Sequence, residues 1–123
     1  HVVVVHGEDG MDEISITGKT FIAELKNNEI SEYTIDPSLF GLKKGNLEDI
    51  TVTDSEHSKN IILDILAGNS SVARDIAVLN AGAAIYVSGL TKDINTGILM
   101  AQEKIDDGKA LNKLNQLIEA SNV

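Results

Sequence analysis

Four consecutive valines, Val2 to Val5, constrain the fold of this chain more than any other stretch. An apolar, β-branched run without polar alternation predicts a strand buried on both faces, as in a parallel sheet covered by helices. A short acidic loop with two glycines follows and ends in the adjacent carboxylates Asp12 and Glu13. Because α/β proteins bind ligands beyond the carboxyl ends of their strands, this loop is the first candidate for a functional site.

Two later stretches predict an antiparallel hairpin. Residues 20–25 and 29–35 have the composition of strands, and Asn27-Asn28 between them tolerates the positive φ angles of a tight turn. Apolar and polar residues also alternate from Ile14 to Thr17, which predicts one more extended segment.

Helices are predicted from residue 58 onward. Ser58 is the expected N-cap of the first helix, and Ser70 or Ser71 and then Asp93 are expected to cap the next two. Residues 72–88 are apolar nearly all round and rich in small side chains, so we expect them to form the central, buried helix. A fourth helix is expected from about Lys109. The fold class is therefore α/β: part of a mixed sheet with an antiparallel hairpin, packed against about four helices.

Composition narrows the classes of function. The 123 residues suit one domain. With 19 acidic and 10 basic residues, the formal net charge is -9, and aromatic residues make up only 3%. We therefore expect neither nucleic acid nor an anionic membrane as a partner, since both need a basic surface. The chain has no cysteine and no signal-peptide pattern, so a soluble, cytoplasmic protein is expected.

Asp12 and Glu13 are the candidate metal ligands. Carboxylates suit hard cations such as Mg²⁺, which usually takes one or two of them and completes its shell with water and substrate phosphate. The alternative is a solvated acidic turn. His6 is open to three interpretations: a general base, a polar contact to substrate, or a histidine packed at the end of a strand.

Other polar residues are expected to have structural roles. Arg74 and Asp75, in the first turns of the central helix, favour an ion pair with each other or with a loop carboxylate. Asn80 lies on the same apolar helix and needs a partner if it is buried, most simply a loop backbone. The acidic loop lacks the third glycine of a dinucleotide fingerprint, and no phosphate-binding P-loop is present.

Three segments read together resemble the anthranilate phosphoribosyltransferase family: VVHGEDGMDEIS (residues 4–15), ARDIAVLNAGAAIYVSG (73–89) and AQEKIDDGKA (101–110). The stretch FIAELKNNEISEYTIDPSLFGL (21–42) is also similar to that family. The resemblance implies transfer of phosphoribosyl from phosphoribosyl pyrophosphate to anthranilate, with release of pyrophosphate and with Mg²⁺ as cofactor. It places the metal-binding pair on Asp12 and Glu13 and assigns no catalytic residue within this chain.

The resemblance also implies what this stretch lacks. Residues 1–123 correspond to the C-terminal portion of the family's α/β domain, without its N-terminal helical domain and phosphate loop. We therefore expect no transferase activity from this chain alone, and expect the full-length enzyme to be a homodimer through the helical domain. Two alternatives remain open: a related nucleoside phosphorylase-type enzyme, and a non-catalytic interaction module with a solvated acidic loop.

Overall fold

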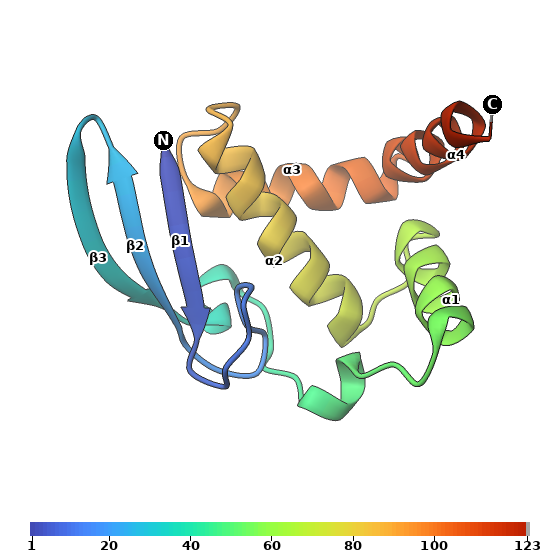
Figure 1. The fold of residues 1–123 in the computed structure, drawn as a ribbon, viewed down its shortest axis with the longest axis horizontal. Helices are drawn as coiled ribbons and strands as arrows, with labels where there is room; N and C mark the ends of the chain where they lie inside the picture. Colours follow the sequence, from blue (N-terminus) through green and yellow to red (C-terminus); the bar gives the residue numbers. More distant parts are fainter. Residues whose placement is uncertain (123) are drawn as a thin grey trace.

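A computed structural model describes residues 1–122 and contains one sheet and four α-helices (Figure 1). The strands are β1 (Val2–Gly7), β2 (Thr20–Lys26) and β3 (Glu29–Ile35), in the order β1-β2-β3. Two short 3₁₀ helices follow, η1 (Pro37–Phe40) and η2 (Leu47–Ile50), and then α1 (Ser55–Leu66), α2 (Val72–Val87), α3 (Ile94–Asp106) and α4 (Lys109–Ser121). The α/β class and the four helices are as the sequence predicts.

The predicted hairpin is confirmed. β2 pairs antiparallel with β3, with Lys26 opposite Glu29, and the turn between them consists of Asn27 and Asn28 at φ 53° and 65°. Two successive residues with positive φ form the type of turn whose twist matches that of the flanking strands. β1 also pairs antiparallel with β2, so all the pairings among the described strands are antiparallel.

The expectation that β1 is buried on both faces is wrong for residues 1–122. Val2 and Val4 are 50% and 63% exposed, whereas Val3 and Val5 pack against the core. The reason is that α2 and the loops cover one face of the sheet only. On the other face, which we call the outer face, Phe21, Leu25 and Ile30 are also exposed.

Residues 14–17 do not form the predicted strand, although Ile14, Ser15 and Ile16 are buried. Ile14 and Ile16 are 2% and 0% exposed, yet the backbone makes no ladder with another strand. Side chains bind it instead: the Ser15 amide donates to Thr20 Oγ1 and the Thr17 amide donates to Ser15 Oγ, at 3.0 and 2.9 Å. Alternating polarity is therefore misleading at this point, because the side chain of Ser15 is fully buried.

The central position of α2 is confirmed. The helix lies between the sheet and α1, and it crosses α3 closely (Figure 1). At the crossing, a Cβ atom on Gly97 of α3 would overlap the carbonyl of Gly82 in α2. The two glycines therefore set the distance between the helices, and the buried side chains of Leu79 and Ile98 pack beside them.

One buried carboxylate links the sheet to α2. Glu24 is 7% exposed and accepts hydrogen bonds from the hydroxyl groups of Tyr86 and Tyr33, at 2.6 and 2.7 Å. His1 Nε2 lies 2.7 Å from the same carboxylate. Burial, together with the Glu24 carboxylate, raises the pKa of Tyr33 above its usual value. Three polar partners thus compensate for the desolvation of Glu24.

The helix boundaries follow the predicted caps with one exception. Ser71 and Asp93 cap α2 and α3 by accepting from the backbone amides three residues later, as expected. α1 begins at Ser55 rather than after Ser58, because Asp54 accepts from the backbone amide of His57 at 2.8 Å and is the true N-cap. Within residues 1–122, no helix is both long enough and apolar enough to span a membrane.

Candidate functional site

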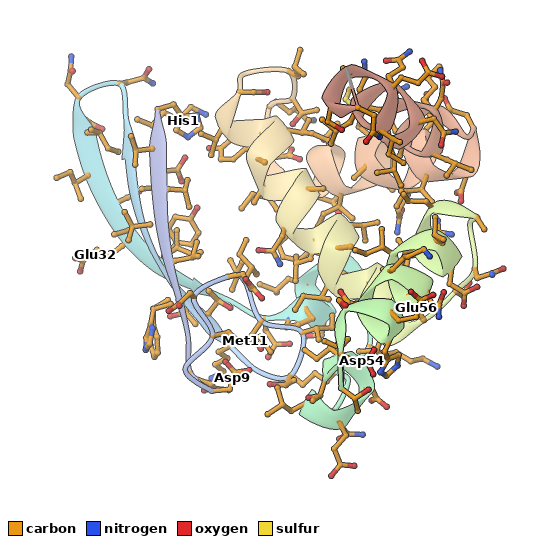
Figure 2. The ribbon with its side chains drawn as sticks, turned by 45° about the vertical axis from the view of Figure 1, so that its right-hand side comes forward. His1, Asp9, Met11, Glu32, Asp54 and Glu56 are labelled. Carbon is orange, nitrogen blue, oxygen red and sulfur yellow. The ribbon has the colours of Figure 1, made fainter. Side chains whose placement is uncertain are left out.

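The candidate carboxylates lie on the segment that joins β1 to β2, residues 8–19, which we call the carboxylate loop. Its two ends are joined where the Glu8 amide donates to the Lys19 carbonyl at 2.9 Å. The Gly7 amide donates to the carbonyl of Met11, also at 2.9 Å, and closes the first turn of the loop. Figure 2 labels Asp9 and Met11 on this loop, at the end of the sheet remote from His1.

Asp9 organises the interior of the loop. Its Oδ1 accepts from the Met11 amide at 3.0 Å, and its Oδ2 accepts from the hydroxyl groups of Ser15 and Thr17. Partial burial opposes ionisation of Asp9, but these hydrogen bonds outweigh it, so the pKa of Asp9 lies below its usual value. The carboxylate therefore remains ionised and connects both halves of the loop.

Glu8 and Asp9 have structural roles that the sequence pattern did not predict. Both residues are exposed, but Glu8 Oε1 accepts from the Lys19 amide at 2.8 Å and Asp9 binds three groups of the loop. One signal was available for Asp9: an aspartate in a turn commonly accepts from the amide two residues later, here that of Met11.

Asn80 attaches the loop to α2. Its Oδ1 accepts from the Ile14 amide at 2.9 Å, and its Nδ2 donates to the Ile14 carbonyl, also at 2.9 Å. The same Nδ2 donates to the carbonyl of Ile76, one turn earlier in α2, at 3.0 Å. The prediction that Asn80 binds a loop backbone is thus confirmed.

Asp12 and Glu13 lie between these two attachment points. Both side chains are exposed, and neither takes part in a side-chain hydrogen bond or ion pair within residues 1–122. Glu13 lines an open hollow of about 330 Å³ together with Ile76, Ala77 and Asn80. The loop therefore presents two carboxylates with free oxygen atoms on an otherwise hydrogen-bonded segment.

This donor set fits part of a Mg²⁺ shell. Adjacent, ionisable carboxylates without partners offer the hard oxygen ligands that Mg²⁺ prefers, and Mg²⁺ commonly takes only one or two of them. No group of three or more His, Cys, Asp or Glu side chains that could hold a metal is found in the part of the chain that the structure describes. The remaining ligands of a Mg²⁺ ion would therefore be water, a phosphate group, or residues other than 1–122.

His6 belongs to a different surface. It lies on the outer face of β1, opposite Phe21 in the register, and lines an open hollow of about 450 Å³ with Val4 and Thr34. Neither Asp12 nor Glu13 lines this hollow. The structure therefore does not bring His6 together with the carboxylate pair.

Arg74 forms a structural ion pair as expected, but its partner is Asp106 of helix α3 rather than Asp75 or a loop carboxylate. Its Nη2 donates to Asp106 Oδ1 of α3 at 2.7 Å, and its Nη1 donates to the Gly68 carbonyl. With a side chain only 12% exposed, it holds the start of α2 against the end of α3. Its neighbour Asp75 is partly buried, which raises the pKa of that carboxyl even though the Arg74 charge opposes the effect.

Comparison with known proteins decides the family. Residues 1–111 match the glycosyl transferase family, a/b domain. The chain belongs to this family. Among its relatives is the anthranilate phosphoribosyltransferase of Methylobacillus flagellatus, which is 50% identical over 117 residues, or 95% of this chain. The enzyme of Laribacter hongkongensis is 49% identical over 97% of the chain.

Solved structures of anthranilate phosphoribosyltransferases have a part that folds like this chain. Anthranilate phosphoribosyltransferase from Saccharomyces cerevisiae in complex with PRPP and Mg superposes with a TM-score of 0.85, at 25% identity over 98% of this chain. The enzyme from Thermus thermophilus gives a TM-score of 0.83 at 30% identity over 93% of the chain. The chain spans about a third of the length of these relatives, 34% of the M. flagellatus enzyme and 35% of the yeast chain.

Proposed function

We propose that this chain is part of an anthranilate phosphoribosyltransferase. The reaction transfers phosphoribosyl from phosphoribosyl pyrophosphate to the amino group of anthranilate, releases pyrophosphate and belongs to tryptophan biosynthesis. The observation that carries the proposal is the carboxylate loop, which offers Asp12 and Glu13 without partners between two attachment points. The likeness to a yeast structure in complex with PRPP and Mg supports it.

In this proposal Asp12 and Glu13 would hold Mg²⁺, and the bound ion would supply positive charge to compensate that of the pyrophosphate leaving group. The chain itself carries a formal net charge of -9, so an anionic substrate is repelled here unless a cation compensates locally. Asp9 and Asn80 hold the backbone on either side of the pair. The contribution of this stretch is therefore to bind and orient one wall of the site.

We further propose that residues 1–123 form the C-terminal portion of the α/β domain. The phosphate loop, the anthranilate contacts and an N-terminal helical domain that makes the homodimer then belong to the rest of the enzyme. The outer face of the sheet supports this, because Val4, Phe21 and Ile30 are 63%, 53% and 74% exposed. Several exposed apolar side chains on one face of a sheet mark a surface that is normally covered.

The test uses the full-length enzyme that contains this chain. Asp12→Asn/Glu13→Gln should lower anthranilate consumption, followed by its fluorescence, by at least about 100-fold and raise the Mg²⁺ concentration needed for half-maximal rate. Glu119→Gln on α4, an exposed carboxylate away from the loop, is the matched control and should behave as wild type.

The alternatives give different results in the same assays. Phosphorolysis of a pyrimidine nucleoside without turnover of anthranilate would support the nucleoside phosphorylase, and no turnover of either substrate would support an interaction module. Residues 1–123 alone should show no transfer, and turnover by this stretch would refute the proposed division of the site. We place the reaction in the cytoplasm, which fractionation of cells that express the enzyme tests directly.

A further inference from the structure

The strongest feature that the proposed metal site does not itself explain is the attachment of Asn80 to Ile14. One side-chain amide on α2 binds both backbone groups of a residue 66 positions away in the sequence. The third hydrogen bond, from Nδ2 to the Ile76 carbonyl, fixes the orientation of the amide on its own helix. Both donors and the acceptor of Asn80 are therefore engaged.

Ile14 requires such a partner. Ile14 is 2% exposed and lies outside any strand, so no neighbouring strand forms hydrogen bonds with its backbone amide and carbonyl. An unpaired buried backbone group is costly, and an asparagine side chain reproduces the donor and acceptor of a neighbouring peptide. Asn80 thus makes the two hydrogen bonds to Ile14 that the backbone of a neighbouring strand would otherwise make.

The location matters for the carboxylate pair. The planar peptide that joins Glu13 to Ile14 contains the amide that Asn80 binds, so holding this amide limits the rotation of the Glu13 backbone. On the other side, Asp9 holds the Met11 amide. Asp12 and Glu13 are the two residues between these anchors, and Asn80 lines the same hollow as Glu13.

We propose that Asn80 is a positioning residue for the metal-binding carboxylates: its bonds to Ile14 orient Glu13, and through it the pair, toward the cation. This inference rests on the proposed function, since it concerns the same site. Groups that orient metal ligands typically contribute 10- to 100-fold in metal affinity or activity. Fixed geometry, rather than direct contact with the metal, is the contribution of Asn80.

Two variants test this in the full-length enzyme. Asn80→Asp keeps an acceptor for the Ile14 amide but removes both donors, and Asn80→Leu removes all three bonds. We expect the dissociation constant for Mg²⁺, measured by calorimetry in the presence of pyrophosphate, to rise about 10-fold in both variants. Hydrogen exchange of the peptide that contains the Ile14 amide should be faster in Asn80→Leu.

A control variant on the same helix distinguishes a positioning role of Asn80 from a purely structural one. Val78→Ala removes methyl groups from a side chain that is 1% exposed, and should lower the melting temperature without changing the affinity for Mg²⁺. The proposal is overturned if the Asn80 variants lose stability like Val78→Ala but bind Mg²⁺ as wild type does. Absence of transferase turnover in the wild type would refute the proposed function separately, because the Mg²⁺ titration involves no reaction.

Discussion

Replacement of Asp9 tests whether the carboxylate loop is held together by one set of hydrogen bonds. Asp9 accepts from the Met11 amide, the buried hydroxyl of Ser15 and the hydroxyl of Thr17. Hydrogen bonds to a charged group contribute about 1.5–3 kcal/mol each when shielded from water and less where the group is exposed. Because Asp9 is exposed on one side, we expect Asp9→Ala to lower the free energy of unfolding by about 2–4 kcal/mol.

The matched control is a second aspartate of the same loop. Asp12→Ala changes the same side chain three residues later, where no hydrogen bond or ion pair is lost within residues 1–122. Its stability should stay within about 0.5 kcal/mol of wild type. Urea unfolding of the full-length enzyme at pH 7 measures both variants. Equal stability of the Asp9 and Asp12 variants would refute this account of the loop.

The pH dependence of this prediction has a definite sign. The pKa of Asp9 is lower in the folded chain than in the unfolded one, so its ionised form stabilises the fold above the unfolded pKa, about 3.9. That contribution is lost as the pH falls through the lower, folded pKa. The stability difference between wild type and Asp9→Asn should therefore be constant above about pH 5 and shrink below about pH 4. A stability difference between wild type and Asp9→Asn that grows as the pH falls would contradict this prediction.

Two other positions give predictions for stability. Gly97→Ala should lower the free energy of unfolding by about 1–2 kcal/mol. The overlap of the new Cβ with the Gly82 carbonyl outweighs the higher helix propensity of alanine. An unchanged midpoint of urea unfolding would show that α2 and α3 can move apart without loss of stability. Glu24→Ala should lower the free energy of unfolding by about 2–3 kcal/mol, because two tyrosine hydroxyls and His1 lose their acceptor. A melting temperature equal to that of wild type would mean that water replaces the carboxylate.

Local chemistry explains which elements were predictable. Asn27 and Asn28 form the hairpin turn because they tolerate positive φ, and Ser71 and Asp93 start helices because their oxygens accept from the first free amides. Each of these interactions involves residues at most three positions apart. Asp12 and Glu13 were likewise found from the loop that follows a strand, although their role as metal ligands remains a proposal.

Interactions between distant residues explain the rest. The run from Val2 to Val5 predicts a strand, but its burial depends on what covers each face, and within residues 1–122 only one face is covered. Residues 14–17 have the polarity of a strand, yet Asn80, far along the chain, binds the Ile14 backbone in place of a ladder.

The sequence by itself therefore determined the hairpin, the four helices, the caps of α2 and α3 and the place of the carboxylate pair, because short-range hydrogen bonds and periodicity are properties of neighbouring residues. Only the tertiary structure decided how the pair is held. Asp9 joins the two halves of the loop, and Asn80 joins the loop to α2. The Asp9 contacts form only when the loop closes on itself, and the Asn80 contacts form only when the loop packs against α2.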